Sequence, residues 1–400
     1  MTGTVAPHPP DRDRRRMPLW LLAIGPLALL ALLVVAIIEL GPADAILGEA
    51  PPVEELSVQR VELGEYGFRL AVINDGPDPV TVAQVMVDEA YWSFTLRPDR
   101  PLSHLGAAEI TIPYPWVEGE AHEIVLVSSS GVTFPHEVEV AVATPRPSGR
   151  YFWLFALVGL YVGVIPVALG LAWYPLLRRL GRKGIDFVLA LTVGLLLFLL
   201  VDTTNEGFEI AGSTPASYQG LALLLFAGLA AYLGLETFGA WMRARRAGTP
   251  GWTNALLVAV GIGLHNFGEG LAIGAAFALG EAALGTLLIL GFTLHNTTEG
   301  LAIVAPLSKE RAGLGRLVVL GVVAGAPTIV GAWTGGFVYS PIWSVAFLGI
   351  GAGAIAQVAV QITRSSAGER PLTGYFREAP VFAGLLAGVC LMYATGLMVG

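Results

Sequence analysis

The sequence predicts a polytopic α-helical membrane protein with an N-terminal anchor helix and an all-β domain outside the membrane. Of its 400 residues, 54% are hydrophobic and only 14% are charged, which is typical of a chain embedded largely in lipid. Its apolar residues gather in nine segments long enough to cross a bilayer, and a polar stretch with strand-like alternation separates the first from the second. We therefore expect an anchor region at 1–40, a β domain at 41–150 and an eight-helix body at 151–400.

The nine predicted spans follow one another closely after the β domain. They run approximately over residues 18–40, 151–177, 185–209, 217–242, 253–279, 282–306, 314–338, 342–363 and 379–399. The first has an apolar run of about 20 residues, longer than the roughly 7–15 of a signal peptide, so we expect an uncleaved anchor. Pro166 and Pro327 lie inside spans and are expected to kink or break them, which is tolerated where neighbouring helices or a cavity supply hydrogen-bond partners.

The positions of the basic residues predict how the chain is oriented in the membrane. Outside residues 41–150, Lys and Arg occur only at alternate ends of the spans, and the connections around 210–216, 279–282 and 339–341 contain none. Because basic residues favour the cytoplasmic side, we expect a cytoplasmic N-terminus, with the β domain and the C-terminus outside the plasma membrane.

The polar stretch at 41–150 alternates apolar and polar residues in short runs, such as 68–73 and 123–127, separated by turn signals. This pattern predicts a β-sandwich of about seven strands. The stretch carries 17 acidic residues and six arginines, a formal charge of −11. One interpretation is a solvated acidic module. The other is a cation-collecting or metal-sensing domain that would use three dispersed histidines, His104, His122 and His136.

Ten residues occur almost twice in the membrane body. Residues 264–273 and 294–303 match at eight of ten positions, at an offset of 30 residues. Both copies lie inside apolar spans, where ionisable residues are costly and usually functional. Gly270 and Gly300 stand at the same place in the two copies, and such small residues favour close approach between helices.

Each copy carries a His and a Glu four positions apart, so the two side chains share one helix face. The pairs are His265 with Glu269 and His295 with Glu299. A turn within residues 278–282 would put the two histidines at depths of roughly 24 and 21 Å in antiparallel helices. The sequence therefore predicts that the two faces form one site of mixed nitrogen and oxygen ligands, suited to a divalent transition metal.

An eight-span block with His-Asn-x-x-Glu-Gly in its fourth and fifth helices resembles the ZIP family of divalent metal transporters, and in particular its GufA-like bacterial branch. The resemblance covers roughly residues 151–400. It implies that the fourth and fifth helices line the transport site and that six residues bind the metal: His265, Asn266, Glu269, His295, Asn296 and Glu299.

The chain departs from the family pattern in places. The Pro that commonly precedes the motif carboxylate is replaced by Gly268, which would keep that helix flexible, and by Thr298, which would bond back to a carbonyl. Acids common in the sixth and seventh helices are replaced by Ala326, Gln357 and Gln361. These replacements predict one well-formed metal position rather than a binuclear centre.

Asp202 and Glu206 also lie four positions apart near the outer end of a span, and we expect them to line the ion pathway. Gln357 and Gln361, one turn apart, are further pathway candidates.

The resulting expectation is a divalent metal transporter rather than an enzyme. Zinc is the expected ion, with iron and manganese as alternatives, and the ion is substrate rather than a prosthetic group. A metal-responsive receptor built on a degraded transporter and an intramembrane metallohydrolase are the other hypotheses. The expected partners are metal ions and the lipid bilayer, and a homodimer is a possible assembly. We expect no nucleic acid as a partner.

Overall fold

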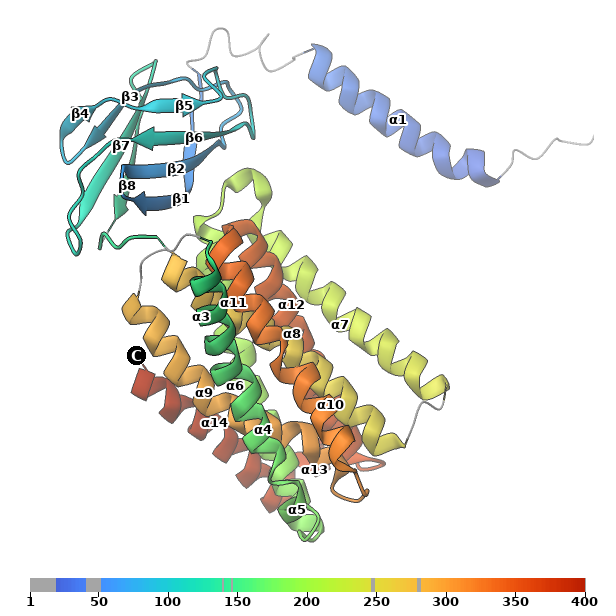
Figure 1. Cartoon of the computed structure of the whole chain (residues 1–400). Coiled ribbons are helices and arrows are strands. Elements are labelled where there is room, and N and C mark those ends of the chain that lie inside the picture. The colour runs from blue at the N-terminus through green and yellow to red at the C-terminus, as the bar shows by residue number, and fades with distance from the viewer. Residues whose placement is uncertain are drawn as a thin grey trace, which may run out of the picture. The chain divides into compact units, whose positions relative to one another are not determined.

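The computed structural model describes residues 19–40, 52–138, 140–144, 147–245, 249–278 and 282–399. The chain divides into two compact units, residues 1–53 and residues 54–400. Helix α1 (Leu19–Leu40) belongs to the first unit, and the β domain and the helical body belong to the second (Figure 1).

The described part of the β domain contains eight strands in two antiparallel four-stranded sheets, of order β1-β2-β6-β5 and β4-β3-β7-β8. The strands are β1 (Leu56–Gly64), β2 (Gly67–Asn74), β3 (Val82–Val87), β4 (Ala90–Trp92), β5 (Thr95–Arg97), β6 (Ala107–Ile112), β7 (His122–Ser128) and β8 (Thr133–Val138). Apolar residues of both sheets, including Phe68, Ile110 and Leu126, are buried in one shared core. The alternation seen in the sequence therefore puts one face of each strand in that core.

The alternating run at 91–96 suggests one strand, whereas the structure divides it. Its first part belongs to β4 and its second to β5, and these strands lie in different sheets. The chain crosses between sheets at Ser93 and Phe94, and Phe94 packs against the core. Alternation alone does not reveal such a crossing, because both halves keep the same period.

The rest of the second unit is helical. Its elements are α3 (Gly149–Gly159), η1 (Leu160–Val164), α4 (Ile165–Leu171), α5 (Tyr174–Leu177), α6 (Arg182–Ser213), η2 (Ala216–Tyr218), α7 (Gly220–Ala244), α8 (Pro250–Ala278), α9 (Ala282–Val304), η3 (Ala305–Leu307), α10 (Leu314–Gly325), α11 (Pro327–Val338), α12 (Pro341–Ala367), α13 (Leu372–Arg377) and α14 (Ala379–Val399).

Among the described residues, seven helical segments are long and apolar enough to cross a membrane. The two other predicted spans, the first and the last, are also helical, with shorter apolar stretches at Ile24–Ile37 and Ala379–Ala394. The predicted turn of the motif hairpin falls between α8 and α9, and residues 279–281 within it lie outside the described residues.

Both internal prolines interrupt their helices, as predicted. Pro166 follows η1, a π-helical turn, and Pro327 opens α11 directly after the end of α10. A residue without an N–H group cannot continue the α-helical hydrogen-bond ladder, which explains both irregularities.

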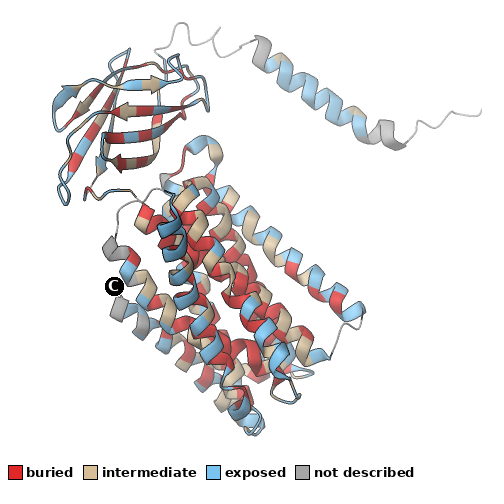
Figure 2. Ribbon diagram, viewed as in Figure 1, coloured by how far each residue is buried: buried red, intermediate tan, exposed pale blue. Residues whose placement is uncertain are grey.

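The helices bury their motif-bearing faces in the body, and α8 is the most buried of the candidate spans (Figure 2). A Cβ atom on Gly270 of α8 would lie 2.1 Å from the carbonyl oxygen of Thr328 in α11. One on Gly300 of α9 would lie 2.3 Å from that of Val167 in α4. The expected close approach is confirmed: α8 pairs with α11, and α9 with α4, backbone against backbone.

Candidate metal site

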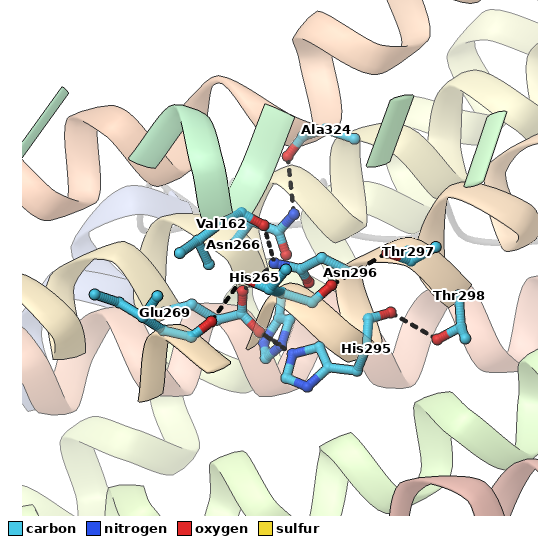
Figure 3. A network of polar contacts seen from close by, with 11 residues as sticks. Val162, His265, Asn266, Glu269, His295, Asn296, Thr297, Thr298 and Ala324 are labelled. Atoms are coloured by element: carbon cyan, nitrogen blue, oxygen red, sulfur yellow. Dashed lines mark hydrogen bonds and ion pairs between the residues drawn. The ribbon is translucent and has the colours of Figure 1, made fainter. Parts of the chain in front are cut away.

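The two motif copies meet in the structure. His265 and Glu269 of α8 and His295 of α9 each offer one ligand atom, and these atoms lie within 4.8 Å of one another (Figure 3). All three side chains are buried, with 4–8% of each residue exposed. Among the described residues, this is the one group of three or more His, Cys, Asp or Glu side chains with such geometry.

Glu269 lies at the centre of the group. Its Oε1 contacts Nε2 of His295 across the hairpin and lies 3.2 Å from Nε2 of His265 on its own helix. Its Oε2 accepts a hydrogen bond of 2.8 Å from the amide of Asn296. A buried carboxylate is stabilised only by such partners or by a cation. Glu269 has two hydrogen-bond partners, both on α9, while Nε2 of His265 lies close by without a hydrogen bond among the described residues.

The two motif asparagines are fixed at the helix interruptions. The amide of Asn296 donates to the carbonyl of Val162 at 3.1 Å, and that of Asn266 donates to the carbonyl of Ala324 at 3.1 Å. In a regular α-helix Val162 would accept from residue 166, but Pro166 has no N–H to donate. Ala324 lies in the last turn of α10, three residues before Pro327. Each asparagine therefore satisfies a carbonyl where a neighbouring helix is interrupted.

Glu299, the carboxylate of the second copy, has a different environment. Only 2% of the residue is exposed, and neither carboxylate oxygen has a hydrogen-bond partner among the described residues. The side-chain oxygens of Asn266 and Asn296 are also buried and also have no hydrogen-bond partner among the described residues. Buried acceptors without donors are uncommon and costly, so this half of the site needs a proton or a cation.

The residues that directly precede the two motif carboxylates also differ in their surroundings. Thr298 Oγ1 donates to the carbonyl of His295 at 2.6 Å, which confirms the expected back-bonding. Gly268 has no atom within 4 Å of the position of a Cβ. The helix around the second carboxylate is thus held by a side-chain hydrogen bond, whereas that around the first has free space beside it.

A cavity of about 20 Å³ adjoins the three ligands. Asp202 and Glu206 of α6 line it, so the structure brings both predicted pathway acids to the site. The other lining residues are Leu199, Thr203, His265, Gly268, Glu269, Phe292, His295, Phe347, Leu348 and Gly351. Phe292 and Phe347 could not be recognised as site residues from the sequence, because aromatic residues inside spans are usually lipid-facing or core residues.

Gln357 and Gln361 lie elsewhere, outside the lining of this cavity. Gln357 Nε2 donates to Glu236 at 3.2 Å and to Gln361 at 3.1 Å, and Gln361 Nε2 donates to Asn254 at 2.9 Å. The two glutamines thereby connect α12 with α7 and α8.

The β-domain histidines do not converge on one point. His104 Nδ1 hydrogen-bonds the carbonyl of Gly76 at 2.9 Å, while His122 Nδ1 contacts Asp88 at 2.7 Å. Burial raises the pKa of Asp88, but hydrogen bonds, chiefly from Tyr114, outweigh it and lower the pKa overall. The same contact raises the pKa of Tyr114 to about 12. We therefore interpret Asp88 as a structural hydrogen-bond acceptor.

Two imidazoles and a carboxylate, with further carboxylates nearby, form a donor set that suits zinc and neighbouring divalent ions. No protein-family model matches the chain, and no curated protein matches it. The interpretation of the site therefore depends on its geometry.

Proposed function

We propose that the chain is a multi-pass transporter of divalent transition metals, with zinc as the expected substrate. The observation that supports this most is the meeting of His265, Glu269 and His295 within 4.8 Å, buried in helices long enough to cross a membrane. A structural contact between two helices needs one polar pair, whereas this site gathers three ligands and has unpartnered oxygens beside them.

The ligand set favours a site that releases its ion. Histidine and carboxylate ligands exchange more readily than a closed thiolate cage, and the one cysteine, Cys390, lies on another helix and is exposed. Asp202 and Glu206 at the adjoining cavity would lead a cation toward the ligands from the outer side. We propose movement toward the cytoplasm by alternating access across the plasma membrane, driven by an ion gradient. The N-terminus would be cytoplasmic, with the β domain and the C-terminus outside.

The test is uptake by the purified full chain in proteoliposomes, with Zn²⁺, Fe²⁺, Mn²⁺, Mg²⁺ and Ca²⁺ supplied separately. We expect saturable Zn²⁺ uptake that Glu269→Gln removes and that Glu209→Gln retains. Glu209 is an exposed acid of the same helix as Asp202, outside the lining of the cavity, and it controls for loss of one negative charge. The absence of saturable uptake of any ion, or full uptake by Glu269→Gln, would overturn the proposal.

A further inference from the structure

A rigid turn follows strand β2 in the β domain. Asn74 is fully buried, and its amide donates to the carbonyls of Asp78 at 2.7 Å and Leu102 at 2.8 Å. Its side-chain oxygen accepts from the backbone N–H of Gly76 at 2.9 Å. With every polar group of Asn74 paired, the next residue, Asp75, is held in a fixed position.

Asp75 contacts the helical body. Its carboxylate accepts from the backbone N–H of Ala216 at 2.5 Å and from that of Ser217 at 3.0 Å. The hydroxyl of Ser217 donates in return to the backbone carbonyl of Asp75 at 3.1 Å. Only 7% of Asp75 is exposed. Three hydrogen bonds thus join this turn to η2, more than 140 residues away in the chain.

The Asp75 side chain is stabilised in its charged form. Burial raises the pKa of Asp75, but hydrogen bonds from Ser217 and Ala216 outweigh it and lower the pKa overall, helped by nearby His104. A charged carboxylate at the first N–H groups of a helical turn makes a stronger contact than a neutral one.

The segment that Asp75 holds is short and stiff. Residues 214–219 connect α6 to α7, Thr214 Oγ1 donates to the carbonyl of Ala211 at 2.7 Å, and Gln219 adopts a left-handed conformation with φ 48°. A Cβ on Gly220 would lie 2.4 Å from Thr214 Oγ1. A displacement of η2 would therefore pass directly to the outer end of α6.

We infer that Asp75 is a positioning residue, through which the β domain clamps η2 and so fixes the outer part of α6. Asp202 and Glu206 on that helix line the cavity beside the three ligands. The clamp sets the distance between these acids and the ligands, and hence the ease with which a cation enters. The expected effect on flux rests on the proposed transport function. The contact between Asp75 and η2 does not depend on that function.

The experiment compares Asp75→Ala with Asp99→Ala in the full chain in lipid nanodiscs and in proteoliposomes. Asp99 is an exposed acid of the same domain, and its replacement removes the same charge. Hydrogen–deuterium exchange should become on the order of tenfold faster at the Ala216 and Ser217 amides in Asp75→Ala alone, because these amides lose their acceptor. Zn²⁺ uptake should fall severalfold in the same variant, and Ser217→Ala, which keeps both backbone bonds, should show a smaller effect on both measurements.

Unchanged exchange at residues 216 and 217 in Asp75→Ala would overturn the clamp. Faster exchange with wild-type uptake would overturn its link to the pathway. An equal loss of uptake in Asp99→Ala would assign the effect to the domain's negative charge instead. If the wild-type chain shows no uptake, the proposed function fails, and the exchange comparison still decides whether the clamp exists.

Discussion

The two copies of the repeated motif have eight of ten residues in common, yet the structure gives their carboxylates opposite environments. Glu269 in the first copy contacts His265, His295 and Asn296. Glu299 in the second copy has no hydrogen-bond partner among the described residues. A repeated sequence thus supplies equivalent side chains, and the packing of the helices decides what each one does.

The asymmetry has a geometric origin. His295 reaches across the hairpin to Glu269, but the converse contact, from His265 to Glu299, is absent among the described residues. His265 instead lies beside the carboxylate of its own helix. One carboxylate thus gathers both imidazoles, and the other is left for a proton or a cation.

Uptake of Zn²⁺ gives the largest effect and tests whether the two copies serve one site. Glu269→Ala and Glu299→Ala should each reduce uptake at least about 100-fold, because each removes negative charge that offsets the dehydration of the cation. His265→Ala and His295→Ala should weaken and broaden selectivity more than they abolish uptake. Proteoliposome uptake measures all four. Normal uptake by a correctly inserted Glu299→Ala would make the second copy a structural element only.

The stability of the metal-free protein should separate the copies. Removing Glu269 breaks a buried cluster, which typically costs about 3–5 kcal/mol. Removing Glu299 deletes a buried acid that has the Asn266 side chain beside it but no hydrogen bond of ordinary geometry, so it should cost much less. Thermal unfolding in detergent, with a chelator present, measures the difference. Equal destabilisation by Glu269→Ala and Glu299→Ala would contradict the asymmetry.

The asparagines predict a smaller difference in stability, and in the opposite direction, because the better-connected asparagine, Asn296, belongs to the second copy. Asn296→Ala removes hydrogen bonds to both Val162 and Glu269 and leaves buried groups unpaired, so it should destabilise by about 2–3 kcal/mol. Asn266→Ala removes the bond to Ala324 and should cost about 1 kcal/mol. The same unfolding assay compares the two variants, and a larger destabilisation by Asn266→Ala than by Asn296→Ala would contradict this difference.

Proton competition should give the smallest effect. Metal ligation requires the free nitrogen of an unprotonated imidazole, so apparent Zn²⁺ affinity should fall as the pH is lowered from 7.5 to 5.5. His265→Gln and His295→Gln should each reduce this dependence. Affinity measured by titration at pH 5.5, 6.5 and 7.5 tests this. A flat profile in the wild-type chain would exclude histidine ligation.

Much of this arrangement was accessible from the sequence, because hydropathy and helical periodicity act over short distances. The nine helical segments, the interruptions at Pro166 and Pro327 and the grouping of His265, Glu269 and His295 all follow from local patterns. The expectation that Asp202 and Glu206 line the ion pathway depended only on their spacing near the outer end of a span.

The remaining features depend on contacts between distant segments. Nothing in the sequence marks the carbonyls of Val162 and Ala324 as the partners of the asparagines, because backbone groups carry no sequence signal. The clamp at Asp75 is hidden for a similar reason, since Asn-Asp-Gly-Pro also describes an ordinary surface turn. The placement of Gln357 with Glu236, away from the cavity, likewise depends on which helix packs against which.

The glycines at Gly270 and Gly300 have a mechanical consequence. Within each pair, α8 with α11 and α9 with α4, backbone meets backbone, so one helix cannot slide along the other without steric collision. The two pairs also meet backbone against backbone, because a Cβ on Gly163 of η1 would lie 2.6 Å from the carbonyl oxygen of Gly325 at the end of α10. The four helices are therefore expected to move as one rigid block, so that a displacement that opens the site falls between this block and α6, which carries Asp202 and Glu206.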